Sequence, residues 1–162
     1  MEKQKIITVT GRSGSGKTTL IERLVKEYIA EGRSVSVLKS MRHDFDIDRE
    51  GKDTYRYREA GVRSCIITNG RKFAMMSDNT GDATALELAL KYFPDDDIIF
   101  IEGYKEGETR KIEVIGDTNE APLFMSDSNI VMVVTDRDTG TALPLFKRDD
   151  ISGIKECIEK IF

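Results

Sequence analysis

The sequence comprises 162 residues, of which 39% are hydrophobic and 33% charged, and its formal net charge at pH 7 is -4. A chain of this length buries a hydrophobic core without disulfides or structural metal, so we expect one domain over residues 1–162. The acidic balance lacks the Lys and Arg excess that binds nucleic acid backbones. No apolar run reaches the roughly 18 residues of a membrane span, and no secretory signal is evident, so we expect a cytoplasmic protein without nucleic acid or membrane partners.

The two cysteines, Cys65 and Cys157, are far apart in the sequence and lack the paired spacing of zinc-binding or redox motifs. Isolated cysteines in such a chain behave as small hydrophobic residues. We therefore expect both thiols to be reduced and buried.

Apolar runs alternate with amphipathic stretches, which favours an α/β sheet covered by helices on both faces. The first elements are a strand at 6–10, a glycine-rich loop at 11–16 and a helix over 17–30. A second parallel strand at 34–38 follows at the spacing of a right-handed βαβ unit. Residues 39–53 are dense in polar and charged side chains and are predicted to form an exposed loop.

The rest of the chain adds a hairpin and three further strands to this pattern. Asn69 and Gly70 are typical of a tight turn, and we expect the hairpin to add antiparallel strands to the parallel core. Besides the hairpin strands at 64–68 and 72–76, the predicted elements are helices at 54–60, 82–92 and 151–161 and strands at 98–101, 111–115 and 130–134.

A phosphate-binding motif lies between the first strand and the first helix. Residues 11–18 read Gly-Arg-Ser-Gly-Ser-Gly-Lys-Thr and match the P-loop pattern G-x-x-x-x-G-K-[ST]. Its backbone N–H groups and lysine bind the phosphates of a nucleoside triphosphate, and its hydroxyl residue binds Mg²⁺. The motif predicts a P-loop NTPase-type three-layer sandwich with a mixed, mostly parallel sheet. The predicted phosphate-binding residues are Gly11, Ser13, Gly14, Ser15, Gly16, Lys17, Thr18 and Thr19.

An acidic residue ends the predicted strand at 98–101. The run Asp97-Ile-Ile-Phe-Ile-Glu102-Gly103 has the form of a Walker B segment, with glutamate in place of the commoner aspartate. A carboxylate at this position reaches the metal ion or its waters, so Thr18 and Glu102 are the predicted Mg²⁺ residues. The alternative is an acidic side chain that merely ends a strand.

A degenerate guanine-binding motif follows the predicted strand at 130–134. Guanine-selective sites use the last carboxylate of Asn-Lys-x-Asp, which accepts two N–H bonds from the purine. This chain reads Thr135-Asp136-Arg137-Asp138, so Asp138 is the expected guanine-binding residue. A plain solvated turn is the alternative.

His43, the only histidine, is followed by Asp44, Asp46 and Asp48 in the predicted loop. One histidine does not make a zinc site by itself. The alternatives are a metal site shared with the carboxylates, a loop that contacts phosphate or a partner, and plain surface. We favour the phosphate-side or partner loop.

Seven short segments of the sequence, taken together, resemble the molybdopterin-guanine dinucleotide biosynthesis adapter family, MobB. The resemblance covers most of the chain and depends on the order and spacing of the segments. They are residues 11–19, Lys39, 43–48, 51–56, 59–61, 102–105 and 111–114.

The resemblance implies a homodimeric GTP-binding adapter, with GTP and Mg²⁺ as ligands, that assists guanylylation of molybdopterin in molybdenum cofactor biosynthesis. A separate partner, a molybdopterin guanylyltransferase, would perform the transfer, and intrinsic GTP hydrolysis by the adapter would be weak. The chain departs from the family at Ser40-Met41-Arg42, where members often have further histidines, and at Arg12 and Ser13 of the P-loop.

Two other functions fit a P-loop. A small-molecule kinase would add an arginine-rich lid, for which Arg56, Arg58 and Arg63 are available. A metallochaperone GTPase for nickel enzymes would need clustered Cys and His, and the sequence has none. No Gln or His is evidently placed to orient an attacking water, so any GTP hydrolysis is expected to be slow.

Overall fold

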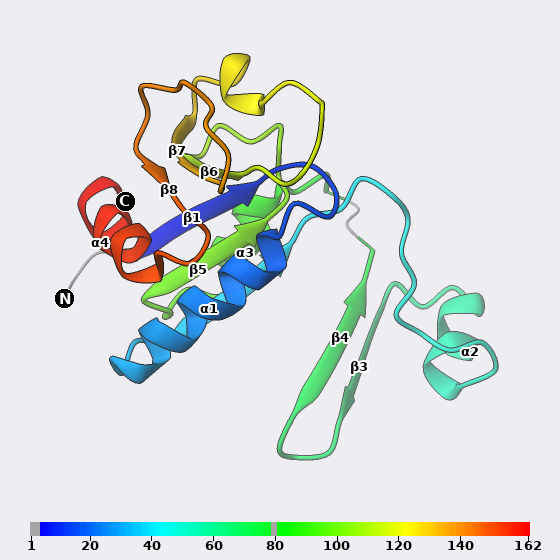
Figure 1. Ribbon diagram of the computed structural model, residues 1–162. Helices are drawn as coiled ribbons and strands as arrows, with labels where there is room; N and C mark the ends of the chain where they lie inside the picture. The colour runs from blue at the N-terminus through cyan, green and yellow to red at the C-terminus, as the bar shows by residue number, and fades with distance from the viewer. Residues whose placement is uncertain (1–3, 79–80) are drawn as a thin grey trace. The chain divides into compact units, whose positions relative to one another are not determined.

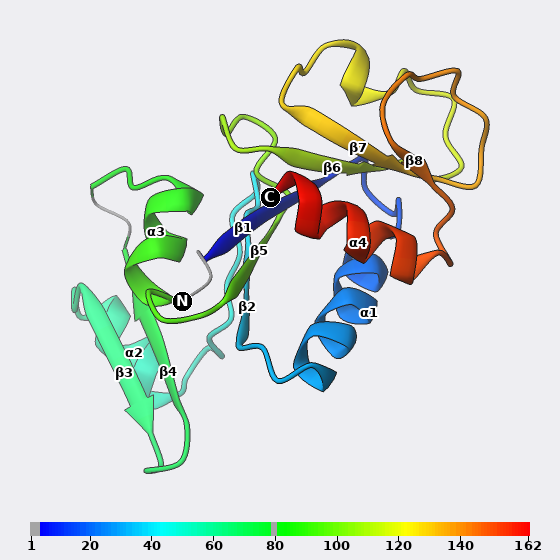
Figure 2. The same ribbon diagram turned by 90° about the vertical axis from the view of Figure 1, so that its left-hand side faces the viewer.

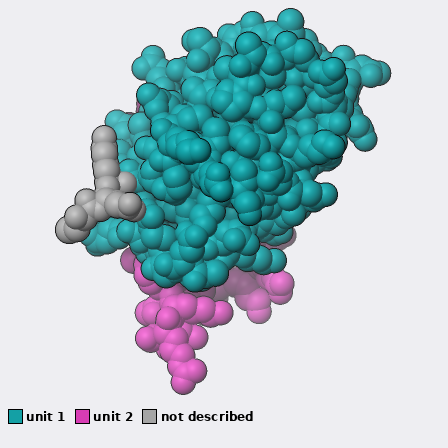
Figure 3. All heavy atoms as spheres, turned by 60° about the vertical axis from the view of Figure 1, so that its left-hand side comes forward, with its two compact units in different colours: residues 1–41, 84–162 teal, residues 42–83 magenta. Residues whose placement is uncertain are grey.

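The computed structural model describes residues 4–78 and 81–162 (Figure 1). The chain forms two compact units, coloured separately in Figure 3. Residues 4–41 and 84–162 form one, here called the sheet unit, and residues 42–78 and 81–83 form the other, the hairpin unit. The single domain expected over residues 1–162 stays a prediction.

The sheet unit contains a six-stranded sheet in which every neighbouring pair is parallel. The carboxyl ends of the strands therefore meet at one edge, which is where open α/β sheets bind ligands. In spatial order the strands are β2 (Val35–Lys39), β5 (Ile98–Glu102), β1 (Lys5–Thr10), β6 (Lys111–Val114), β7 (Ile130–Val134) and β8 (Leu145–Phe146).

Helices cover both faces of this sheet. Figure 2 shows α1 (Lys17–Ala30) and α4 (Ile151–Ile161) on one side and α3 (Ala85–Tyr92) on the other. Successive strand side chains point to opposite faces, so Phe100 of β5 packs with α1 and α4, whereas Ile99 and Ile101 pack with Ala89 of α3. The predicted α/β fold with three layers and a mostly parallel sheet is confirmed.

The hairpin unit consists of α2 (Asp53–Glu59) and the antiparallel strands β3 (Ser64–Thr68) and β4 (Phe73–Ser77). Asn69 makes the turn, since its side-chain oxygen accepts the N–H groups of Arg71 and Lys72. The expectation that these strands join the parallel sheet is wrong, because β3 and β4 form a sheet of their own. A tight turn determines which two strands pair with each other, but it does not determine which sheet they join.

Two short elements were not predicted, and one predicted boundary differs from the observed one by more than one residue. The strand β8 and the 3-10 turn Leu123–Met125 were not expected, and α3 begins after Thr84 rather than at Asp82. The Thr84 hydroxyl accepts the Glu87 N–H while Glu87 binds back to the Thr84 N–H, which is a capping box.

Both cysteines are free thiols, but Cys65 and Cys157 are half-buried rather than buried. Cys65 lies on β3 of the two-stranded sheet, which is too small to bury its side chains on both faces. Cys157 lies at the margin of the core cluster that α4 forms with α1. In residues 4–78 and 81–162, no helix combines the length and the apolar composition needed to cross a membrane.

Candidate nucleotide-binding site

The P-loop joins the end of β1 to the start of α1 at the carboxyl edge of the sheet. A Cβ on Gly11 would stand 2.3 Å from the carbonyl oxygen of Val114, so this position requires glycine. Gly16 occupies the N-cap of α1, where no side chain hydrogen-bonds to the first N–H groups of the helix. Unpaired N–H groups and the helix dipole together make this end of α1 an anion-binding site.

Two side chains of the loop lack the partner that a phosphate would provide. The ammonium of Lys17 lies over its own loop and donates to the carbonyl oxygens of Gly11 at 3.2 Å and Arg12 at 2.7 Å. The hydroxyl of Ser15 is buried and has no hydrogen-bond partner within the part of the chain that the structure describes. Because a buried unpaired hydroxyl costs about 1–3 kcal/mol, a ligand oxygen at this place would be stabilising.

The electrostatic environment of Lys17 also favours an anion. Burial lowers the pKa of its ammonium below the ordinary value, and the ammonium groups of Lys105 and Lys39 lower it further. The carboxylate of Glu102 acts in the opposite direction. The site therefore gathers three cations around one carboxylate, and phosphate groups would neutralise the excess positive charge.

Thr18 and Glu102 meet as the sequence predicts. The Thr18 hydroxyl donates to the two carboxylate oxygens of Glu102 at 3.0 and 3.1 Å. Glu102 is 8% exposed at the end of β5, and the ammonium of Lys39, at the end of β2, lies 3.6 Å from its carboxylate. Hydroxyl and carboxylate oxygens are the ligands that Mg²⁺ prefers, so these residues fit a Mg²⁺ ion that also binds phosphate and water.

Asp138 lies on the exposed turn after β7, where its carboxylate accepts the N–H of Gly140 at 3.1 Å. Sequence reasoning missed the neighbouring pair of Asp136 and Arg148, in which the carboxylate accepts the Arg148 backbone N–H at 3.2 Å. The Arg148 guanidinium lies 4.0 Å from where a Cβ of Gly16 would stand. Arg148 follows β8, the strand that the sequence did not reveal.

Two of the three acidic residues that follow His43, Asp46 and Asp48, are bound within the hairpin unit. The Asp46 carboxylate accepts the Asp48 N–H at 2.8 Å and an Arg58 N–H at 3.1 Å, and these two bonds, the backbone one foremost, lower the pKa of Asp46. Asp48 accepts the hydroxyl of Thr54 at 2.8 Å. Among the residues with described coordinates, no three His, Cys, Asp or Glu side chains are grouped to hold a metal ion. The loop is therefore held by its own hydrogen bonds.

The fold and the loop after β1 define this protein as an α/β protein of the P-loop NTPase type. The sequence profile of the family described as molybdopterin guanine dinucleotide synthesis protein B, MobB, matches residues 6–136. The chain belongs to this MobB family.

Relatives that match most of the chain have related names. The molybdopterin-guanine dinucleotide biosynthesis adapter protein of Haemophilus influenzae is 36% identical over 132 residues, which are 80% of this chain and 74% of the relative. The protein of that name from Escherichia coli K12 is 30% identical over 152 residues, 90% and 86% of the two chains.

Solved structures show the same fold. A crystal structure of molybdopterin-guanine biosynthesis protein B superposes with a TM-score of 0.77 at 24% identity, covering 97% of this chain and 99% of the other. Bacillus subtilis MobB superposes with a TM-score of 0.75 at 24% identity over 98% of both chains.

Proposed function

We propose that this protein is a cytoplasmic GTP-binding adapter that assists the guanylylation of molybdopterin, the task that the names of its relatives indicate. The observation that carries this proposal is the uncapped start of α1 beside Lys17 and the Thr18–Glu102 pair, in a chain of the MobB family. In this proposal Gly11, Ser13, Gly14, Ser15, Gly16, Lys17, Thr18 and Thr19 bind phosphates, Thr18 and Glu102 hold Mg²⁺, and Asp138 selects guanine.

A partner enzyme, a molybdopterin guanylyltransferase, performs the transfer in this proposal, and the adapter itself hydrolyses GTP slowly. The kinase alternative finds less support. The guanidinium of Arg58, one candidate for a phosphate lid, is bound to Asp46 at 3.1 Å and lies 3.5 Å from Asp48. The relatives named above are described as adapters, and none as a kinase.

We also propose a homodimer whose interface includes the hairpin unit. None of its described residues, 42–78 and 81–83, is fully buried. One face of β3 and β4 carries Ile66, Phe73 and Met75, which are 59%, 72% and 39% exposed. A two-stranded hairpin is at best marginally stable alone, and contiguous exposed apolar side chains mark interaction sites. A second copy would cover this face.

The test is retrieval of the molybdopterin guanylyltransferase of the same cell by the purified protein, with GTP and without, together with an assay of cofactor guanylylation at limiting GTP. We expect GTP-dependent binding and a raised yield for the wild type and for Lys26→Ala, which removes an exposed charge of α1. Lys17→Ala should lose both effects. A wild-type protein that leaves the yield unchanged and phosphorylates a small metabolite would establish the kinase instead.

A further inference from the structure

Lys105 lies on a segment that is tightly held at the carboxyl edge of the sheet. The N–H of Gly103, the first residue after β5, donates to the carbonyl oxygen of Val9 in β1 at 2.9 Å. On its other side, a Cβ on Gly103 would stand 2.4 Å from the carbonyl oxygen of Ser40, which follows β2. The chain therefore leaves β5 between the ends of β1 and β2, and Lys105 follows within two residues of this point.

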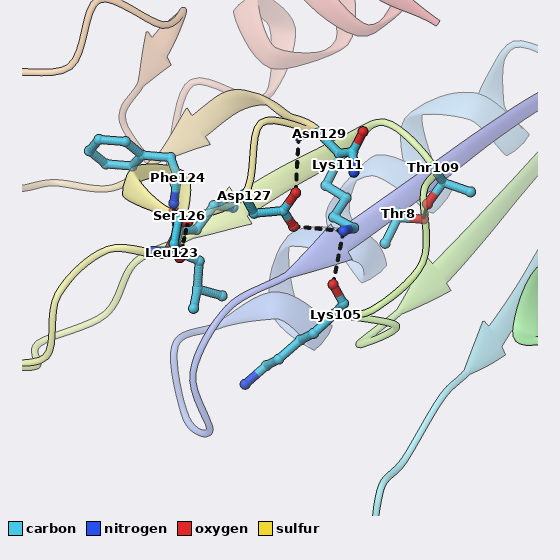
Figure 4. A network of polar contacts seen from close by, with 10 residues as sticks. Thr8, Lys105, Thr109, Lys111, Leu123, Phe124, Ser126, Asp127 and Asn129 are labelled. Carbon is cyan, nitrogen blue, oxygen red and sulfur yellow. Dashed lines mark hydrogen bonds and ion pairs between the residues drawn. The ribbon is translucent and has the colours of Figure 1, made fainter.

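A buried ion pair fixes the backbone of the same segment. Lys111 is 1% exposed, and its ammonium lies 2.6 Å from the Asp127 carboxylate and donates to the carbonyl oxygen of Lys105 at 2.9 Å (Figure 4). Asp127 also accepts the N–H of Asn129 at 3.0 Å. A buried ammonium is costly unless its hydrogen bonds are satisfied, so the Lys105 carbonyl is a required partner. We call Lys111 and Asp127 the brace.

The side chain of Lys105 extends from this fixed backbone towards the P-loop (Figure 4). Its ammonium has no hydrogen-bond or ion-pair partner among residues 4–78 and 81–162, and it is one of the two cations that act on Lys17. A half-buried cation without a counter-ion beside an anion site is a ready phosphate ligand.

We propose that Lys105 binds the terminal phosphate of the nucleoside triphosphate, and that the brace of Lys111 and Asp127 positions it for this contact. The inference rests on the proposed function and extends it. Thr18 and Glu102 would hold Mg²⁺, which would neutralise charge on the terminal phosphates, so this pair marks the metal side of the site. Lys105 approaches from the segment that follows Glu102, so it reaches the γ-phosphate and distinguishes a triphosphate from a diphosphate.

The experiment measures the affinities of the purified protein for GTP and GDP in the presence of Mg²⁺. We expect Lys105→Met to lower the affinity for GTP by about tenfold or more, since one charge-assisted hydrogen bond to the γ-phosphate is lost. The affinity for GDP, which has no γ-phosphate, should fall by less than about twofold. Lys26→Met, which removes an exposed ammonium elsewhere on the sheet unit, is the matched control and should change neither affinity.

Asp127→Asn tests the brace. This substitution should lower the ratio of GTP affinity to GDP affinity in the wild-type background. In the Lys105→Met background it should not change this ratio further, because Asp127 acts on the nucleotide only through Lys105. Partial unfolding lowers the apparent affinities for GTP and GDP by the same factor, so a loss of stability alone does not change the ratio of the two affinities. An Asp127→Asn effect that persists in Lys105→Met overturns the positioning role.

The two proposals fail in different ways. If the wild type binds GTP and Lys17→Ala does not, but Lys105→Met keeps the wild-type ratio, the role of Lys105 is overturned and the nucleotide site stands. If the wild type binds no nucleotide, the proposed function is overturned together with this inference.

Discussion

The Thr18 hydroxyl, on the first turn of α1, donates to both carboxylate oxygens of Glu102, 84 residues further along the chain at the end of β5. A bound Mg²⁺ would take the hydroxyl oxygen as a ligand and reach Glu102 directly or through a water. We expect Thr18→Ala to weaken GTP binding about tenfold with Mg²⁺ and little in EDTA, because a metal-site contact is lost. Titration of GTP at several Mg²⁺ concentrations measures this. Equal weakening in both conditions would place the metal elsewhere.

Lys17→Ala should abolish detectable triphosphate binding. Each charge-assisted contact is worth about 1.5–3 kcal/mol, and several such contacts of the P-loop are coupled. The fold should remain intact, since Lys17 contacts only carbonyl oxygens of its own loop through hydrogen bonds. Calorimetric titration and thermal unfolding check the two halves of this prediction. Retained affinity with normal Mg²⁺ dependence would contradict the P-loop assignment.

Asp138→Asn tests the guanine contact. If the carboxylate accepts two purine N–H bonds, replacing it with an amide should reduce the affinity for GTP. The nucleotide preference should shift towards xanthosine triphosphate, because its base has a carbonyl acceptor where guanine has its exocyclic amino donor. Competition binding of the two nucleotides measures the shift. Asp136→Asn is the comparison variant, and a change of preference there alone would assign the base contact to the residue that binds Arg148.

Asp127→Asn should lower stability in a pH-dependent way. Burial alone would raise the pKa of Asp127, but the hydrogen bonds from Lys111 and Asn129 outweigh it, so the pKa lies below its ordinary value of 3.8. A carboxyl with a depressed folded-state pKa stabilises the protein above its unfolded-state pKa and loses this contribution as pH falls through the folded-state pKa. Removing one partner of a buried pair costs about 3 kcal/mol.

Urea denaturation checks this prediction at pH 7 and at pH 3. The difference between wild type and Asp127→Asn should be largest at pH 7 and should shrink at pH 3, where the wild-type carboxyl begins to be protonated. Asp95→Asn, an exposed carboxylate near the end of α3, is the control and should match wild type at both pH values. A difference independent of pH would mean that the charge of Asp127 is not what stabilises the fold.

Phe73→Glu should convert the proposed homodimer to a monomer, because it places a charge in the exposed apolar face of β3 and β4. Light scattering during size exclusion gives the mass. The matched control is Met125→Glu, since Met125 and Phe73 are each 72% exposed and Met125 lies in the sheet unit. A wild-type monomer would contradict the dimer, and a dimer that survives Phe73→Glu would place its interface elsewhere.

The P-loop could be predicted from the sequence because its residues are contiguous and each type has a local reason. Glycine at position 11 avoids a clash with the carbonyl oxygen of Val114, and Lys17 and Thr18 start a helix directly after it. Glu102 could be found because it ends the buried run of β5, whose five residues are all buried. These signals depend on local spacing and on burial.

Features that depend on long-range pairing could not be predicted. The two-residue strand β8 pairs with β7 through Leu145 and Phe146, and nothing in so short a run distinguishes it from a loop. The brace joins Lys111 to Asp127 only after β6 and β7 align. The start of α3 is different, because Thr84 and Glu87 have the local spacing of a capping box, which is a signal present in the sequence.

The position of β1 between β5 and β6 links ligand binding to the assembly of the sheet. In this register Val9 lies opposite both Glu102 and Ile112. The strand β1 must therefore pair with β5 and β6, which are about a hundred residues away in the chain, before the P-loop and Glu102 face each other. Bringing segments so far apart in the chain together costs conformational entropy before any stabilising contact forms between them. A nucleotide that binds only the closed sheet raises the free energy of unfolding with its concentration, so the cellular GTP level would itself protect this fold.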